Sequence, residues 1–263
     1  MSRNSQNARS TDPDDYQRVP RAVAAMPKDF AAGFEIAPHR HERAQLIYAT
    51  TGTMRISTGD GVWVVPPRRG LWMPAGMCHS IVMSGEVSMR TLYLRGDAIE
   101  GMPETCRVLP ISPLLRELIV RATELPMQYD ERGPAGHVVA LILTELRAEQ
   151  SLPLQLPMPR DTRLRRVCQA LLAAPGDPRT LDAWAGTANA SARTLARLFQ
   201  SETGLTFGAW RQQARVLEAM GRLANGAPVT QVALDLGYES VSAFSAMFRR
   251  AAGASPSAFR HQP

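Results

Sequence analysis

The spacing of hydrophobic and polar positions changes along the chain of 263 residues. Between residues 34 and 94, short runs of β-branched and aromatic residues are separated by turn residues such as Pro66 and Pro67. This pattern is typical of strands in a sandwich or small barrel. From residue 111 onward, apolar side chains recur every three or four positions, as they do on one face of an α-helix. The pattern predicts an α+β multidomain protein with a β-rich N-terminal part and an all-helical C-terminal part.

Composition and turn residues divide the chain further. Residues at the start are polar and poor in hydrophobic side chains, which predicts disorder. Ser112 and Pro113 supply an N-cap and a first-turn residue for the first long helix. The expected segments are a disordered tail over residues 1–19, a barrel over 20–110, a helical segment over 111–150, a Pro-rich linker over 151–162 and a helical domain over 163–263.

The C-terminal segment contains one helix-turn-helix pattern twice. The matching positions are Leu181 and Val229, Ala185 and Ala233, Asn189 and Gly237, Ser191 and Ser240, and Phe199 and Phe248. Asn and Gly tolerate the left-handed backbone angles that a sharp turn needs. Each Ser is expected to cap the helix that follows it. A single copy would be equally typical of an ordinary helical bundle, whereas two aligned copies predict two DNA-recognition units.

Residues from about 163 to 261 resemble the DNA-binding domain of the AraC/XylS family of bacterial transcription regulators. The second unit carries the signature residues Val229, Ala233, Gly237, Tyr238, Ser240, Phe244, Ser245, Phe248, Gly253 and Pro256. The first unit matches at Arg197, Phe199, Glu202, Gly204, Trp210 and Arg215. The resemblance implies two helix-turn-helix modules joined by a central helix, here about Phe207–Leu223. Their recognition helices would enter successive major grooves of double-stranded DNA.

The distribution of charge agrees with that division. Residues 161–263 carry a net charge of +5, whereas residues 1–160 carry +1. The basic excess therefore lies on the part expected to bind DNA, where it can neutralise phosphates.

Base recognition is expected mainly from the first unit. Arg193 and Arg197 lie one turn apart, and Arg is well suited to bind guanine O6 and N7, although either could contact only phosphate or an acidic neighbour. Many family members have an arginine at the position of Ala246, so the second unit is expected to rely more on phosphate and methyl contacts. The expected DNA-contacting residues are Ser191, Arg193, Thr194, Arg197, Ser240, Val241, Ser242, Ser245, Ala246, Arg249 and Arg250.

Four polar side chains of the predicted barrel suggest a binding site. On an unbroken strand His39, His41 and Gln45 project from one face, because side chains alternate with period two, and His79 would approach from a neighbouring strand. These stretches resemble the two motifs of cupin barrels, which the AraC/XylS family commonly uses as sensor domains. The resemblance implies a partly preserved metal site, since metal-binding cupins have Glu in place of Gln45 and Asn in place of Met83.

Two roles for this cluster stay open. Three imidazoles could hold Zn, Ni, Cu or Fe. We favour the alternative, polar lining of an effector pocket, because the missing carboxylate lowers the negative charge that attracts a cation. Tyr48, Trp63 and Trp72 are candidates to line the same effector pocket, or they are core residues.

An enzymatic role is not expected, and no catalytic residue is assigned. Glu42 is the only acidic candidate near the histidines, and its even-numbered position places it on the opposite strand face. A metal-dependent cupin enzyme with a DNA-binding tail stays open as an alternative. So does a constitutive DNA-binding protein whose barrel only dimerises.

The sequence does not indicate a membrane-bound or secreted protein. No apolar run approaches the length of a membrane helix, and no N-terminal segment resembles a signal peptide. Cys78, Cys106 and Cys168 form an odd, scattered set that suits a reducing compartment. We therefore expect a cytoplasmic protein.

Together these features predict a sequence-specific transcription regulator controlled by a small-molecule effector in the barrel. Family resemblance favours an activator that contacts RNA polymerase, with repression of its own promoter as a common second role. Similarity around His39 and in the linker to regulators of drug-efflux genes suggests an efflux or detoxification target. In the family, helices after the barrel pair two protomers, so we expect a homodimer. Its apolar stripe would comprise Val138, Leu141, Ile142 and Leu146, although any barrel-docked helix shows such a stripe.

Overall fold

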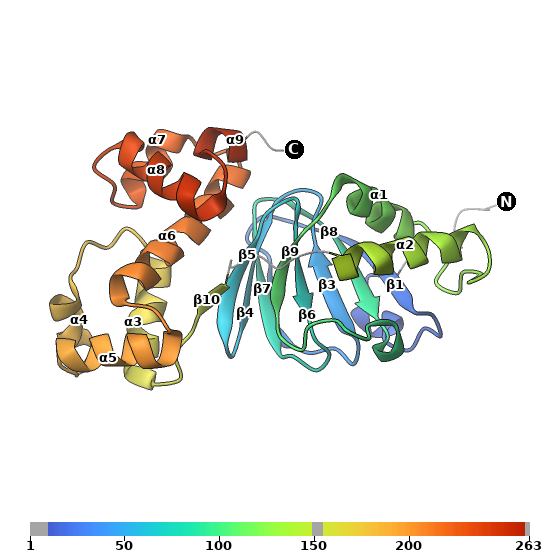
Figure 1. The fold of residues 1–263 in the computed structure, drawn as a ribbon, viewed down its shortest axis with the longest axis horizontal. Coiled ribbons are helices and arrows are strands. Elements are labelled where there is room, and N and C mark those ends of the chain that lie inside the picture. Colours follow the sequence, from blue (N-terminus) through green and yellow to red (C-terminus); the bar gives the residue numbers. More distant parts are fainter. Residues whose placement is uncertain (1–9, 149–154, 261–263) are drawn as a thin grey trace. The chain divides into compact units, whose positions relative to one another are not determined.

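The N-terminal part of the chain contains two antiparallel sheets (Figure 1). In the computed structural model, which describes residues 10–148 and 155–260, the sheets have the orders β1-β8-β3-β6-β9 and β10-β5-β4-β7-β2. The strands are β1 (Val23–Phe30), β2 (Glu35–His39), β3 (Ala44–Tyr48), β4 (Thr53–Thr58), β5 (Gly61–Val65), β6 (Arg69–Met73), β7 (His79–Ser84), β8 (Val87–Leu94), β9 (Arg107–Pro110) and β10 (Gln155–Pro157). The short 3₁₀ helices are η1 (Pro13–Tyr16) and η2 (Gly96–Ala98). The predicted β-rich class is confirmed.

Two units can be distinguished within the described residues. One comprises residues 10–54 and 65–148, and the other comprises residues 55–64 and 155–260. Residues 55–64 belong to the same unit as the C-terminal helices, because β10 pairs with β5, with Leu156 opposite Val62.

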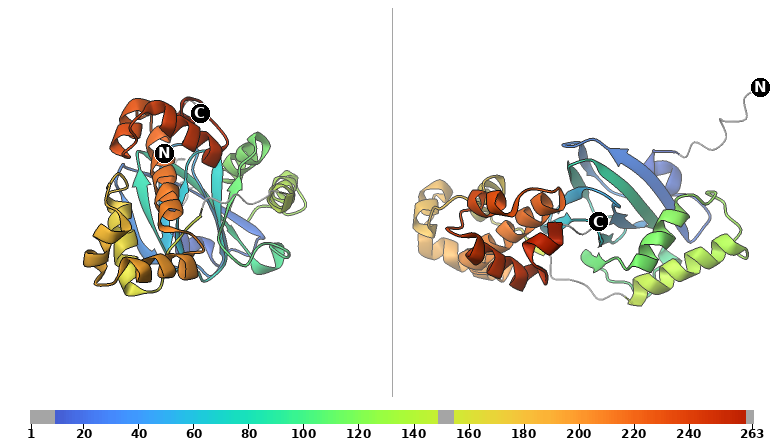
Figure 2. Two further views of the ribbon diagram at one scale, coloured as in Figure 1. Left: turned by 60° about the vertical axis from the view of Figure 1, so that its left-hand side comes forward. Right: turned by 90° about the horizontal axis from the view of Figure 1, so that it is seen from above.

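Helices α1 (Pro113–Ala122) and α2 (Pro134–Ala148) cover one face of the first sheet (Figures 1 and 2). Ser112 caps α1 by accepting the backbone N–H of Leu115 at 3.0 Å, and Pro113 occupies the first turn, as predicted. Between sheet and helices lies a continuous apolar core whose members include Leu46, Tyr48, Trp72, Leu115, Ile119, Ile142 and Leu146. Burial of these side chains holds the helix pair on the sheet.

The chain before β1 packs on the barrel. Tyr16 is fully buried, and its ring centroid lies 6.0 Å from that of Tyr93. The guanidinium of buried Arg43 donates hydrogen bonds to the carbonyl oxygens of Gln17, Val19 and Arg21. The predicted disordered tail over residues 1–19 is therefore wrong from residue 10 onward, because Tyr16 and Arg43 give this polar segment an anchor. Residues 1–9 lie outside the described residues.

The two helix-turn-helix units share α6 (Phe207–Ala224). The first unit contains α3 (Thr162–Ala173), α4 (Leu181–Ala188) and α5 (Ala192–Thr203); the second contains α7 (Val229–Asp235), α8 (Val241–Ala252) and α9 (Pro256–Arg260). Figure 1 shows them at the two ends of α6. The central helix predicted at about Phe207–Leu223 is confirmed, with one further residue.

The turns have the backbone geometry that the repeat predicts. Asn189 and Gly237 adopt left-handed φ angles of 50° and 75°. Ser191 and Ser240 cap α5 and α8, each Oγ accepting the backbone N–H three residues later at 3.1 Å. The second turn therefore accommodates its extra residue without losing the cap.

The segment predicted as a Pro-rich linker contains a short strand. Leu156 of β10 is fully buried, and Trp210 of α6 donates its indole N–H to the carbonyl oxygen of Pro157 at 2.8 Å. Proline disfavours a helix but is compatible with an edge strand, which explains why residues 155–157 are extended. Residues 149–154 lie outside the described part of the chain.

Candidate functional site

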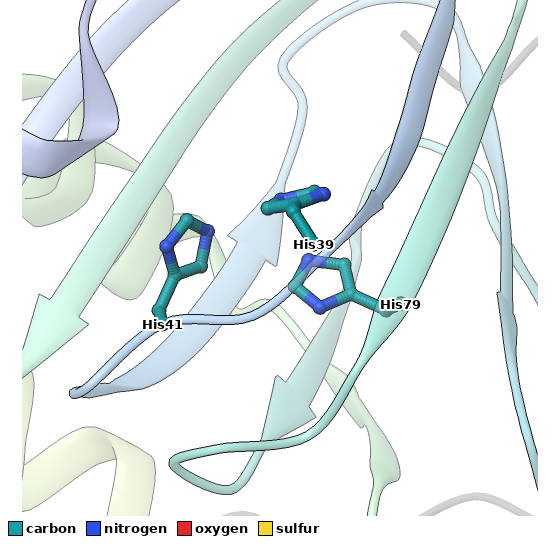
Figure 3. A group of neighbouring side chains, drawn as sticks. All are labelled: His39, His41 and His79. Carbon is teal, nitrogen blue, oxygen red and sulfur yellow. The ribbon is translucent and has the colours of Figure 1, made fainter.

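Three histidines converge in the N-terminal unit (Figure 3). One ring nitrogen from each of His39, His41 and His79 lies within 4.8 Å of those of the other two. His39 ends β2 and His79 begins β7, and these two residues face each other in the antiparallel ladder. His41 follows β2 in a loop, not on the unbroken strand that the sequence predicts, and the β2–β7 register shifts between Ile36 and His39. The convergence thus arises from a β-irregularity and a loop.

Local hydrogen bonds orient two of these rings. Nδ1 of His39 lies 2.8 Å from the carbonyl oxygen of Ala37, and Nδ1 of His79 lies 3.0 Å from that of Met77. A carbonyl oxygen can only accept, so Nδ1 must carry the proton in both rings and Nε2 presents its lone pair. Nε2 of His79 is buried without a hydrogen-bond partner among the described residues.

The cluster favours neutral imidazole. Burial lowers the pKa of His79 to about 4. Burial, assisted by the charges of His39 and His79, also lowers the pKa of His41 to about 4. Both rings are therefore uncharged near neutral pH, which is the protonation state in which histidine coordinates a metal ion.

Gln45 presents an acceptor from the opposite sheet. Its Nε2 donates to Oγ1 of Thr91 at 2.9 Å, and the Thr91 hydroxyl donates to the carbonyl oxygen of Leu46 at 3.0 Å. Oε1 of Gln45 is buried and has no partner among the described residues. Gln45, His39 and His41 line one cavity, and His79 lies beside the other two histidines.

The cavity beside the histidines has a volume of about 520 Å³. Apart from the polar end, its wall is largely apolar, and its members include Met26, Phe30, Phe34, Ile81, Met89 and Tyr93. Pro13 and Asp14 of the N-terminal segment contribute to the same wall. A largely apolar wall with a few polar groups at one end is the usual character of a small-molecule site.

The aromatic residues proposed for the pocket lie elsewhere. Tyr48 and Trp72 belong to the core between sheet and helices, and Trp63 is buried in β5. None of the three lines the 520 Å³ cavity. Side-chain alternation separates Tyr48 from Gln45, because the two are three positions apart on β3. Sequence reasoning missed Tyr93, which is paired with Gln45 across the ladder; that register is not visible in the sequence.

Acidic groups lie nearer the histidines than the sequence suggests. Asp14 lines the cavity, and Glu42 joins Asp14, Asp15 and His41 around an adjoining open pocket of about 1090 Å³. The expectation that Glu42 is the only acidic candidate near the cluster is therefore wrong, because it overlooked the packed N-terminal segment.

The expected DNA-contacting faces of α5 and α8 are exposed. Leu195 and Phe199 bury the inner face of α5, while Arg193 and Arg197 point to solvent and form no ion pair with any described residue. Thr194 is partly buried, its hydroxyl 2.9 Å from that of Ser191. On α8 the two exposed arginines lie in the last turn, whereas those of α5 lie in its first two turns. Its exposed or partly exposed residues include Val241, Ser242, Ser245, Ala246, Arg249 and Arg250.

Two family models match adjoining parts of the chain. The model of an AraC-like ligand binding domain matches residues 31–183, and that of a helix-turn-helix domain matches residues 184–262. The chain belongs to the AraC family of helix-turn-helix transcription regulators. It combines a ligand-binding domain with a DNA-binding domain.

Curated relatives carry corresponding names. The transcriptional regulator NimR of Escherichia coli is 34% identical over 83% of this chain and 80% of its own length. The transcriptional regulator RipA of Corynebacterium glutamicum is 38% identical over 39% of this chain and 31% of its own length. The transcriptional activator RhaR of Escherichia coli is 30% identical over 48% of this chain and 44% of its own length. Among the described residues, none of the helices has both the length and the hydrophobicity needed to cross a bilayer.

Proposed function

We propose that this chain is an effector-controlled transcription regulator that activates a target promoter in the cytoplasm. The DNA-binding face of α5 supports the proposal most directly, because Arg193 and Arg197 follow a capped turn, are exposed and form no ion pair with any described residue. The effector would occupy the 520 Å³ cavity and bind one arrangement of the protein more tightly than another, which shifts the population toward the DNA-bound or polymerase-contacting state. The proposal includes contact with RNA polymerase, autorepression as a second role and an efflux or detoxification target, as the sequence resemblance implies.

DNA recognition can be divided between specific and nonspecific contacts. In this proposal Arg197 forms bidentate hydrogen bonds with a guanine, whereas Arg250 at the end of α8 contacts phosphate. Ser240, Val241 and Ala246 make the remaining contacts between α8 and the DNA and set the position of the helix in the major groove.

Replacing Arg197 with Ala should weaken binding to an operator selected from random duplexes by about five- to 150-fold, since a bidentate base contact contributes about 1–3 kcal/mol. It should also relax the base preference at one position. Arg250→Ala should weaken binding to all duplexes alike and reduce the salt slope by about 1. Titrations across salt concentrations measure both effects, with Arg166→Ala on the exposed side of α3 as the charge-matched control. An equal loss on operator and random DNA would contradict base recognition by Arg197.

We further propose that His39, His41 and His79 hold a transition metal ion, with Oε1 of Gln45 as a neutral fourth group. The residues fit such an ion, because one ring nitrogen from each of the three imidazoles lies within 4.8 Å of the other two and Nε2 of His79 is buried without a partner among the described residues. Nitrogen ligands suit Zn, Ni, Cu or Fe. A bound ion would supply a Lewis-acidic anchor at the polar end of the effector cavity, while the chain itself binds and orients the apolar part.

Elemental analysis of untagged protein should find about one equivalent of transition metal per chain, the stoichiometry expected for one three-histidine site. The His39→Ala/His79→Ala double variant should lose it, whereas His137→Ala, which removes an exposed histidine on α2, should retain it. Protein that stays metal-free after incubation with each of the four ions would contradict the metal site. The cavity would then remain a histidine-lined pocket for an organic effector.

We also propose a homodimer formed through the helix pair α1 and α2. The predicted stripe divides: Ile142 and Leu146 lie in the core and Val138 packs against it, whereas Leu141 is 48% exposed. Leu114 of α1, which was not part of that stripe, is 51% exposed. Solvent-facing leucines on adjacent helices provide an apolar surface for a second copy of the chain. Ile142 and Leu146 are therefore not available to the partner.

The Leu141→Asp variant should sediment as a monomer at concentrations where the wild type is dimeric, because an unpaired carboxylate would be buried at the interface. Circular dichroism and the melting temperature establish whether the variant is folded. Ile142→Val, which leaves the surface unchanged, serves as the control. A dimer that persists in Leu141→Asp would place the interface elsewhere.

Enzymatic activity is not part of this proposal. Family membership supports regulation, and the curated relatives are named as regulators. A barrel that serves only to dimerise is the alternative. It predicts that cavity variants such as Met89→Trp leave regulation intact.

A further inference from the structure

Three arginines on one face of α6 connect the two helix-turn-helix units. Arg211, Arg215 and Arg222 are spaced by four and seven residues, so they lie along one side of the helix. Nη1 of Arg211 donates to the carbonyl oxygen of Arg179 at 3.0 Å, and Nε of Arg215 donates to that of Pro175 at 2.8 Å. Both acceptors belong to the α3–α4 loop of the first unit. Arg222 instead forms an ion pair with Asp235, the last residue of α7 in the second unit.

The two helix-turn-helix units also touch each other directly. The α3–α4 loop passes so close to the end of α7 that a Cβ added to Gly176 would lie 2.1 Å from the carbonyl oxygen of Asp235. On the other side, a Cβ on Gly237 would lie 3.0 Å from the carbonyl oxygen of Gly176. Figure 1 shows this loop running from the first unit toward the second, alongside α6. The backbone of the α3–α4 loop therefore lies directly against the end of α7 and the α7–α8 turn, with the guanidinium of Arg215 beside the contact.

Arg215 lies at the centre of this junction. Its guanidinium donates to Pro175 on one side and lies over the ring of Tyr238 on the other, 5.6 Å from the ring centroid. Tyr238 directly follows Gly237 in the turn that leads to the recognition helix α8. A planar guanidinium can donate in its plane and stack on its face at the same time, which a lysine ammonium cannot reproduce. One side chain thus binds the loop of the first unit and the turn of the second.

This junction gives the two units a second connection besides α6. A single helix joining two small bundles would allow each bundle to rock about its own contact with the helix. The Pro175–Arg215–Tyr238 bridge closes a ring through α6, the α3–α4 loop and the α7–α8 turn, so that rocking would break a part-buried hydrogen bond and a cation–π contact. The relative rotation of α5 and α8 is thereby restrained.

We propose that Arg215 is a positioning residue that fixes the separation and rotation of the two recognition helices, and so makes binding depend on the distance between the two DNA half-sites. The inference rests on the proposed function, in which α5 and α8 enter successive major grooves. One inserted base pair rotates the second half-site by about a tenth of a turn. A restrained protein can follow that rotation only by twisting the DNA, whereas a protein without the bridge can follow it by rocking.

The test uses full-length protein and duplexes in which the two half-sites of the selected operator are separated by the native spacing, by one base pair fewer or by one or two more. Wild-type protein should bind the altered spacings at least about tenfold more weakly than the native one, because groove alignment is lost. Arg215→Met, which keeps the apolar stem, should reduce this penalty to about threefold or less. Arg215→Lys should behave like Arg215→Met, since it keeps the charge but loses the stacked, forked donor. Wild-type protein, Arg215→Met and Arg215→Lys should all bind a duplex that carries only the first half-site with the same affinity.

A second variant reaches the same junction without removing a charge. Gly176→Ala places a methyl group against the backbone of Asp235 and should push the units apart, so that the preferred spacing relaxes or shifts. Gly208→Ala is the matched control, because a Cβ there meets no heavy atom within 4 Å. Melting temperatures establish that each variant is folded.

The outcomes separate the two proposals. If wild-type protein binds none of the duplexes, the proposed DNA-binding function fails. If wild-type protein binds them but Arg215→Met and Gly176→Ala keep the full spacing penalty, the positioning role fails. Loss of affinity by the same factor on every duplex, including the half-site, together with a smaller salt slope, would make Arg215 a phosphate contact and would also overturn it.

Discussion

The DNA-binding part depends on the burial of one long helix by two small bundles. Each helix-turn-helix unit is too small to build an adequate core alone, and both complete their cores on α6, where Trp210, Leu217, Met220 and Leu223 are buried. Sharing the helix joins the two units, and the contacts of Arg215 with Pro175 and Tyr238 add a second connection between them. The tandem repeat therefore forms a single DNA-binding domain, in agreement with the AraC family to which the chain belongs.

The barrel depends on a different constraint, the register of β2 and β7. Pairing of His39 with His79 places two imidazoles side by side, and the irregularity in β2 lets the following loop return His41 to them. Burial then keeps the pKa values of His41 and His79 low, so the cluster offers lone pairs near neutral pH. An apolar cavity begins at the same point. The proposed effector would bind here, anchored by a metal ion or by the histidines themselves.

The sequence predicted the features that depend on local chemistry. Asn189 and Gly237 identified the turns, and Ser191, Ser240 and Ser112 identified the caps, because these residues meet backbone requirements within one turn of the chain. The four polar residues of the barrel were found from two short motifs. What failed depended on distant partners. The anchoring of Tyr16 needs Tyr93, the cavity wall needs the β3–β8 register, and the division of the α2 stripe needs the position of the sheet beneath it. The junction at Arg215 was equally invisible, since it joins residues about forty and twenty positions away in the sequence.

The most direct test of the central claim, that both recognition helices of one chain bind one face of the duplex, is hydroxyl-radical footprinting of the full-length protein on its selected operator. Two protected stretches on the same face, with centres about 10–11 base pairs apart, are expected if α5 and α8 enter successive major grooves. A single protected stretch, or two that face opposite sides of the duplex, would contradict it.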